Sequence, residues 1–374
     1  MSPLPGYNVE IVSSPPNPGL LSQRGTWFPV GFATNAASDW VYSIDQFNAT
    51  FGARDPSSVL YDSVQQFFRE GGYRAYVNAA ALGGTQTDLE DLLPNITDEL
   101  GPGVISAPGE TTVALQLSVA AYADQTSRIA IIDLEDTDVA ADLITAAEAV
   151  TSQVGDWRCA AFAPWDVIPG VVPGSTRIVP PCGRIAGNLA RNDQLGFGAD
   201  DAAAGAMGVA QWTQGISQPA WTDGDRTNLN GAGVNVTRMI YGVPRTYGFR
   251  SLADQTSKPD WSQFASSRTI SAVEWELSPI AENFVFSKLD GQGHTIKRWQ
   301  AALTAPLMGF WESDDLYGST PQEAFSVGVG PDVNTDATFA AGQLFAKIGL
   351  RTSSMAEQVF IMIAKVPVTE ALAA

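Results

Sequence analysis

The first hundred residues alternate between apolar runs and an amphipathic segment, with short polar joints between them. The run from Thr26 to Ala33 is typical of a buried strand. The stretch from Asp55 to Gly72 has apolar residues at helical spacing, with Asp55 as the predicted N-cap and Gly71-Gly72 at the end. Tyr73 to Ala80 follows at once as a second apolar strand. Strand, helix and strand with short joints predict one βαβ unit.

The middle of the chain repeats this alternation more clearly. Its strands are apolar on both faces, and its helices are rich in Ala, Val and Leu, which is typical of a parallel sheet covered by helices on both sides. The pattern therefore predicts an α/β region with a sheet of three or four strands. The predicted strands cover residues 104–108, 128–134 and 158–164, and the predicted helices cover 110–123, 138–154 and about 184–192.

Beyond Gly205 the pattern changes to Trp, Gly, Asn and short alternating runs. "VTRMIYGV" (236–243) and "TISAVEWEL" (269–277) predict antiparallel strands. A long helix is predicted over residues 293–308, because Ile296, Trp299, Leu303 and Leu307 recur at three- and four-residue spacing.

The two ends of the chain differ from the rest. Residues 1–25 are rich in Pro and Gly and hold one short alternating run, Tyr7 to Val12. At the other end, "EQVFIMIAKVPV" (357–368) is an apolar segment that predicts a further strand. Both ends are predicted to be extended arms that carry one strand each.

Composition narrows the classes of function. The 374 residues are 45% hydrophobic and only 16% charged, which suits either a surface buried in an assembly or a secreted hydrolase. The net charge of −19 argues against a nucleic-acid partner. Residues 288–374 are less acidic, with nine acidic and six basic side chains, so an acidic partner is expected there. Two cysteines give no disulfide framework, and no run is long enough to be inserted in a membrane.

Candidate chemistry is sparse. His294 is the only histidine, so metal sites built from His and Cys are not expected. Cys182 follows Pro180-Pro181 before a small-residue helix, where it is expected to be a small buried residue rather than an activated thiol. Pro-Pro ends a strand there, and the small residues Ala186, Gly187 and Ala190 let the helix approach its neighbour closely.

Two enzyme hypotheses stay open beside a structural role. In "IAIIDLEDTD", Asp133 and Glu135 could serve a Mg²⁺-dependent phosphohydrolase, although Asp136 to Asp138 also suit the cap of the next helix. "SDDLYG" (313–318) with some of the ten Trp residues could line the cleft of a secreted carbohydrate-active protein. The absence of a convincing lysine partner for Asp133 favours the structural role.

Four segments, taken in order, resemble the contractile tail sheath proteins of bacteriophages and related contractile injection systems. The opening "PLPGYNVEIV" and the run "GVPRTYGFR" depart from the usual pattern of that family. The four segments are "FNATFGARDPSSVLYDSVQQFFREGGYRAYV", "APWDVIP" with "VPPCGRIAGNLARND", "TNLNGAGVNVTRMIYGVPRTYGFRSL", and "STPQEAFSVGVGPDVNT".

The resemblance implies a structural, non-enzymatic subunit that needs no cofactor or metal. Such subunits stack as hexameric rings around a tail tube and contract by rigid-body rearrangement. The partners implied are other sheath subunits, to whose sheets each subunit lends its terminal arms, the tail tube protein, and the baseplate and tail terminator proteins. Nucleic acid binding and membrane insertion are not implied. The location implied is the virion tail, assembled in the host bacterial cytoplasm.

The resemblance also implies a domain division within an α/β (α+β overall) chain. A core domain would join residues 26–100 with 271–355, an α/β lobe of mostly parallel strands at 101–270 would be inserted, and 1–25 and 356–374 would be arms. Three sets of residues are expected at interfaces. The strands of the two arms would use Tyr7, Val9, Ile11, Val12, Val359, Ile361, Ile363 and Val366.

The tail tube would contact Lys297, Arg298, Lys347 and Arg351. Other subunits would contact Arg184, Arg191 and Asp193.

Overall fold

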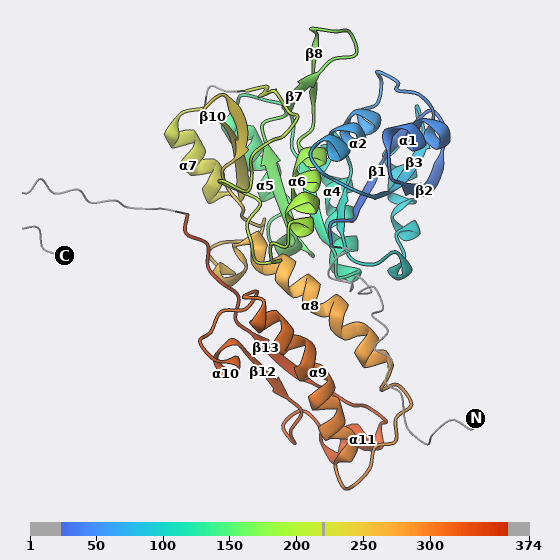
Figure 1. Ribbon diagram of the computed structural model, residues 1–374, viewed down its shortest axis with the longest axis vertical. Coiled ribbons are helices and arrows are strands. Elements are labelled where there is room, and N and C mark those ends of the chain that lie inside the picture. The colour runs from blue at the N-terminus through green and yellow to red at the C-terminus, as the bar shows by residue number, and fades with distance from the viewer. Residues whose placement is uncertain (1–23, 219–220, 358–374) are drawn as a thin grey trace, which may run out of the picture.

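The fold is known from a computed structural model, which describes residues 24–218 and 221–357 (Figure 1). The predicted arm strands at Tyr7–Val12 and at 358–366 lie outside the described residues. A large α/β domain occupies the upper part of the molecule in Figure 1, and a smaller domain hangs below it along the long helix α8. Of the helices in residues 24–218 and 221–357, none has the length and apolar character needed to cross a membrane.

The large domain is built on one eight-stranded sheet in the order β11-β10-β6-β5-β4-β1-β3-β2. The six inner strands are parallel, while β2 and β11 pair antiparallel at the two edges. The strands are β1 (Trp27–Ala33), β2 (Ala37–Val41), β3 (Ala75–Ala81), β4 (Val104–Ser106), β5 (Ile129–Asp133), β6 (Cys159–Ala163), β10 (Val234–Ile240) and β11 (Val243–Thr246).

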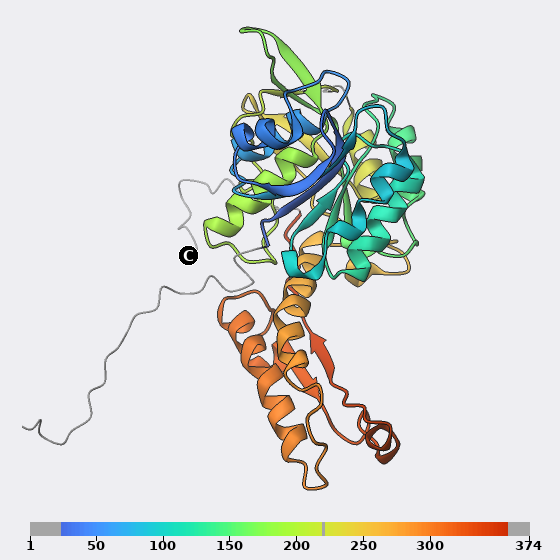
Figure 2. The ribbon, with the colours of Figure 1, turned by 90° about the vertical axis from the view of Figure 1, so that its right-hand side faces the viewer.

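Helices cover both faces of this sheet (Figure 2). Strand β6 shows why its residues are all apolar: Ala161 packs in the core on one face, while Ala160 and Phe162 pack in the core on the other. One face is covered by α3 (Gln86–Glu90), α4 (Val113–Gln125), α5 (Ala140–Glu148) and α7 (Asp223–Gly231), and the other by α1 (Ile44–Phe51), α2 (Leu60–Arg69), α6 (Cys182–Gln194) and the start of α8 (Phe264–Glu282).

A second, three-stranded sheet is attached to the large domain, with β7 (Asp166–Pro169) between β8 (Thr176–Val179) and β9 (Gly215–Ile216). The β7–β8 hairpin projects from the top of the molecule in Figure 1.

The small domain has its own apolar core. In α9 (His294–Glu312), Trp299, Leu303 and Leu307 are buried, so the helix predicted from their spacing is confirmed. This core also takes in the second half of α8 and a two-stranded sheet. The remaining elements are α10 (Pro321–Ala324), β12 (Phe325–Gly328), α11 (Asp336–Ala340) and β13 (Lys347–Leu350).

The predicted α/β class with mostly parallel strands is confirmed, and the arrangement within it needs correction. The sheet has eight strands instead of three or four, because the strands before residue 100 belong to it. Strand β1 pairs with β3 on one side and with β4 on the other. The boundary expected at residue 100 therefore falls inside one continuous sheet, and residues 26–100 form a single domain with the following α/β segment.

Two local predictions were wrong. Residues 269–277 belong to α8 instead of a strand, and burial here does not alternate: Ser271, Ala272 and Val273 are buried in succession, because the helix packs in both domains. Helix α2 begins at Leu60 and not near Asp55. Asp55 instead accepts a hydrogen bond from the backbone N–H of Ser57, 2.8 Å away, and so closes a turn before the helix.

Helix α8 joins the two domains through buried arginines. The guanidinium of Arg128, which is fully buried, lies 5.0 Å from the centre of the Phe28 ring and 5.0 Å from that of Trp275 on α8. Its three nitrogens donate to the backbone carbonyls of Gly101, Ile96 and Thr97 at 2.9, 3.1 and 2.7 Å. Burial lowers the pKa of Arg128 to about 10, so it remains charged at neutral pH.

Two further arginines fix the same helix. Arg158 pairs with Asp124 at 3.0 Å and with Glu274 of α8 at 2.6 Å. Arg268 of α8 pairs with Asp193 of α6 at 2.8 Å, and both side chains are almost fully buried. The first half of α8 is therefore held in the large domain while its second half belongs to the core of the small domain.

Arg128→Met should lower the free energy of unfolding by about 3–5 kcal/mol, because it removes three hydrogen bonds to backbone carbonyls and the contacts of the guanidinium with the Phe28 and Trp275 rings. Denaturant unfolding followed by tryptophan fluorescence measures this loss. Arg69→Met, which removes an exposed arginine on α2, is the matched control and should change stability by less than about 0.5 kcal/mol. Equal effects of the two substitutions would contradict the role given to Arg128.

Candidate assembly surfaces

Arg184 and Asp166 form the most deeply buried ion pair of the large domain. Arg184 Nε donates to Asp166 Oδ2 at 2.7 Å, and neither side chain has any exposed surface. The other two nitrogens donate to the hydroxyls of Thr246 and Thr237 at 2.8 and 2.7 Å. The structure thus gives Arg184 an internal role, in place of the subunit contact predicted from sequence, because it ties α6 to β7, β10 and β11.

Arg191 and Asp193 also bind within the subunit. Arg191 donates to the backbone carbonyls of Glu70 and Val209, both at 2.9 Å, and its side chain keeps an exposed fraction of 19%. Asp193 is 3% exposed and paired with Arg268. Asp193 therefore has almost no surface for another subunit, and of the three predicted contacts only Arg191 reaches the surface.

Helix α6 lies against α2 as closely as its small residues allow. A Cβ atom at Gly183 would lie 2.4 Å from the carbonyl oxygen of Ser63, and one at Gly187 would lie 2.6 Å from that of Phe67. Any side chain at these positions would force the helices apart. The close approach that the sequence predicts for this small-residue helix is confirmed.

Cys182 begins α6 and is fully buried, as predicted. Its backbone N–H donates to Asp133 Oδ1 at 3.2 Å, and the N–H of Gly109 donates to Asp133 Oδ2 at 3.1 Å. Burial raises the pKa of the Cys182 thiol well above its ordinary value, so the thiol stays protonated and is a poor nucleophile.

The arrangement at Asp133 does not suit the phosphohydrolase hypothesis. Asp133 is 2% exposed, and each of its oxygens already accepts a backbone hydrogen bond. Glu135 points to solvent. Within the described part of the chain, no three His, Cys, Asp or Glu side chains come together as metal ligands. Asp133 is thus placed to bind the start of α6 rather than a substrate.

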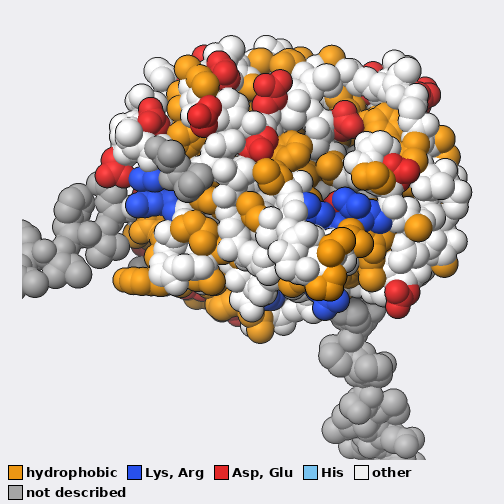
Figure 3. Space-filling model, turned by 90° about the horizontal axis from the view of Figure 1, so that it is seen from above, with side chains coloured by type: hydrophobic (Ala, Val, Ile, Leu, Met, Phe, Trp, Pro, Cys, Tyr) orange, Lys and Arg blue, Asp and Glu red, His pale blue; other side chains and the backbone are white. Residues whose placement is uncertain are grey.

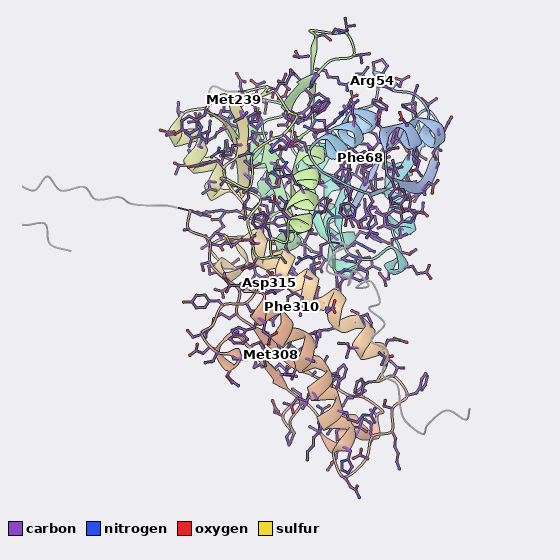
Figure 4. The ribbon with its side chains drawn as sticks, in the orientation of Figure 1. Arg54, Phe68, Met239, Met308, Phe310 and Asp315 are labelled. Carbon is purple, nitrogen blue, oxygen red and sulfur yellow. The ribbon has the colours of Figure 1, made fainter. Side chains whose placement is uncertain are left out.

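One of the two carboxylates of the predicted glycan cleft, Asp315, is buried and bonded within the protein. Asp315 is 4% exposed and accepts a 2.7 Å hydrogen bond from the N–H of Ala199 in the large domain. Figure 4 shows Asp315 near Phe310, where the small domain meets the large one. Asp315 therefore stabilises the junction between the domains.

The small domain presents a sheet whose two edges carry no further strand among the described residues, although the carbonyl of Val327 on β12 accepts a hydrogen bond from Gln300 Nε2 at 3.0 Å. Strands β12 and β13 pair only with each other among the described strands, over four residues from Phe325–Leu350 to Gly328–Lys347. An isolated pair of short strands is marginally stable, and its unpaired edges can accept further strands. The segment "EAFSVGVG", which contains β12, belongs to the last of the four segments that resemble sheath proteins. The sequence gives no clear signal that this strand pairs with β13.

The four predicted tube-facing residues are exposed on the small domain. Lys297 on α9 lines a hollow beside Val329, and Lys347 is paired with Gly328, so both lie toward one end of β12. Arg298 lies 5.8 Å from the centre of the Phe284 ring. Arg351 follows β13 at its other end, roughly 13 Å along the strand from Lys347. The structure thus brings Lys297 and Lys347 toward one another and sets Arg351 apart.

The last described residues return to the large domain, which sequence reasoning missed. The hydroxyls of Thr352 and Ser266 are 2.8 Å apart, and the N–H of Met355 donates to Gln263 Oε1 at 2.9 Å. Glu357 pairs with Arg250. No motif signals these contacts, because the partners are about 90 to 110 residues apart.

Charged side chains of both signs lie on the face of the large domain that is seen from the hairpin end. Figure 3 shows Asp and Glu scattered over this face, and Lys and Arg in a few small groups among apolar and uncharged polar side chains. With 16% charged residues, the chain as a whole has the low charge content that protein interfaces have.

Burial raises the pKa of Asp133 to about 7, against hydrogen bonds from Cys182 and Gly109 that lower it. The unfolded chain ionises near pH 4, so the folded chain holds one more proton between about pH 4 and 7. Its free energy of unfolding should fall with rising pH in that window, by up to about 1.4 kcal/mol per pH unit. Asp133→Asn should remove this component, while Asp223→Asn, at an exposed site, should keep it. Identical pH profiles for all three unassembled proteins would contradict the raised pKa.

Comparison with known proteins gives a consistent result at the level of the fold. No protein-family model matches the sequence, and no curated protein matches it. Solved structures do match. A chain of the anti-feeding prophage baseplate in its contracted state has 21% identity and a TM-score of 0.76, with 97% of this chain and 99% of that chain covered.

Two more structures agree. A chain of the contracted sheath complex of the extracellular contractile injection system PVC has 22% identity and a TM-score of 0.72, covering 97% of this chain and 98% of the other. A sheath tail protein from Listeria innocua has 10% identity and a TM-score of 0.57, covering 88% and 95%. The protein therefore has the fold of the sheath proteins of contractile injection systems, over nearly its whole length.

Proposed function

We propose that this protein is the structural subunit of a contractile tail sheath. Subunits would stack as hexameric rings around a tail tube, and contraction would be a rigid-body rearrangement that drives the tube through the envelope of the target cell. The match of nearly the whole chain to chains of contracted sheath and baseplate assemblies supports this proposal. The buried, fully bonded state of Asp133 and Cys182 supports a mechanical role without catalysis.

The observation that carries the proposal is the two-stranded sheet β12–β13 with its open edges. Extended strands from neighbouring chains would add to these edges through backbone hydrogen bonds, which depend little on side chains. The strand of the N-terminal arm would use Tyr7, Val9, Ile11 and Val12, and that of the C-terminal arm would use Val359, Ile361, Ile363 and Val366. Arms of 15 to 20 residues reach roughly 50 to 65 Å when extended, far enough to enter another subunit.

Rigid-body contraction requires a subunit that keeps its shape. Helix α8 supplies this stiffness, since Arg128, Arg158 and Arg268 bind it on the side of the large domain and the small-domain core holds its far end. The domains would then move together while the arm links bend between subunits.

The small domain would face the tail tube. Lys297, Arg298, Lys347 and Arg351 are exposed cations in a chain with a net charge of −19, so they offer contacts to an acidic tube surface. The other partners proposed are the baseplate and tail terminator proteins at the ends of the sheath, in a virion tail assembled in the host bacterial cytoplasm.

Deleting residues 1–20 should abolish polymerisation and leave a folded monomer, because the arm supplies the link but no part of the described core. Negative-stain electron microscopy should show hollow sleeves for the intact chain and none for the deletion, and circular dichroism should be unchanged. A matched pair of substitutions sharpens the test. Val9→Pro or Glu10→Pro removes a backbone donor of the arm strand and should block polymerisation, whereas Val9→Thr keeps the donor and this variant should still polymerise. Sleeves formed by the deleted chain would contradict arm exchange, and monodisperse monomers of the intact chain would contradict the proposed function.

Reversing charge at Lys297 and Lys347 to Glu should weaken binding to purified tube by about tenfold or more at low salt, and by less at high salt, because the contact is electrostatic. Co-sedimentation measures the binding. Lys288→Glu alters an exposed lysine of the same domain and should bind normally. Unchanged binding by the double variant would show that these two lysines are not part of the tube interface. It would not bear on the proposal that the subunits form sleeves.

A further inference from the structure

The large domain has a groove of about 730 Å³ that the proposed function does not use. Its lining includes the apolar side chains of Ala204, Val236 and Phe249, the last two almost fully buried, together with polar and charged side chains such as Asn230 and Asp223. Arg226 and Arg238 stand at the rim, the latter over the ring of Tyr247 at 5.1 Å. A cavity of this size and character suits a short run of apolar side chains.

The chain itself leads into this groove. Met355 and Glu357 are part of its lining. Met355 is bound to Gln263 through its backbone, and Glu357 is paired with Arg250. The described chain therefore ends on a residue that lines the groove.

The sequence that follows needs cover. Seven of the nine residues from Gln358 to Val366 are apolar, and Lys365 is the only charged one. A run of this kind left in water, rich in β-branched and aromatic residues, promotes association between chains. A subunit that waits for assembly must keep such a run covered.

Tethering favours the chain's own groove as the cover. A segment that follows directly after a residue lining the groove meets it at an effective concentration in the millimolar range, above any ordinary concentration of free subunits. We propose that in the unassembled subunit residues 358–366 lie in the groove of their own chain, bounded by Val236, Phe249 and Arg238, and leave it when the sheath forms. The release step rests on the proposed function, whereas the docking step stands without it.

Hydrogen exchange on the unassembled protein tests the docking step. The intact chain is compared with a chain that ends at Glu357, both below the concentration at which sleeves form. Amides of residues 202–205 and 247–249 should exchange at least about tenfold faster in the shortened chain, since their cover is lost. A synthetic peptide of residues 358–366 should restore the protection.

A matched pair of full-length variants adds a second readout. Ala204→Arg places a long charged side chain inside the groove and should release the segment, raising binding of the dye anilinonaphthalene sulfonate at least about twofold. Asn228→Arg makes a similar change on the exposed side of the neighbouring helix α7 and should not. Both variants should keep the circular dichroism of the parent chain.

Each outcome decides the docking step separately from the proposed function. Equal exchange in the intact and shortened chains overturns the inference, even if sleeves form. Protection that rises with protein concentration also overturns it, because the groove would then hold the segment of another copy. Protection independent of concentration supports it, whether or not sleeves form.

Discussion

The architecture depends on one helix that is buried in two cores at once. The first half of α8 packs under the large sheet and its second half completes the small domain. Arg128 and Trp275 lock the crossing point, because a buried guanidinium between two rings is stabilised only while all three nitrogens have acceptors. The two domains are thereby joined through one shared helix, as the proposed rigid-body movement of a sheath subunit requires.

Buried charged groups of the large domain have partners within the subunit, whereas the small sheet has backbone groups at its edges without a partner among the described strands. Polar groups in the large domain bind one another, as the Arg184–Asp166 pair and the contacts of Asp133 show. The small sheet β12–β13 is different, because its outer backbone groups have no strand partner among the described residues. A fold that leaves a sheet edge without a strand partner is suited to linking with copies of itself through the main chain.

Sequence patterns predicted the elements well and their assembly less well. The strands of the α/β region and helix α9 were found because their apolar residues have a clear period. The prediction of a strand over residues 269–277 was wrong. The sequence of this segment alternates like a strand, but the segment is part of a helix that packs against two domains. The sheet was divided wrongly at residue 100, since no local signal says that β1 pairs with β4 as well as with β3. Arg184 and Asp193 were placed at the surface because charge alone does not reveal a buried partner.

In the proposed assembly, subunits are linked by strands added to β12–β13. A cryo-electron microscopy reconstruction of sleeves formed by the intact chain would show this link. The two-stranded sheet of each subunit should be extended at its edges by strands traced to the termini of neighbouring chains. Sleeves in which both edges of β12–β13 face solvent would contradict it.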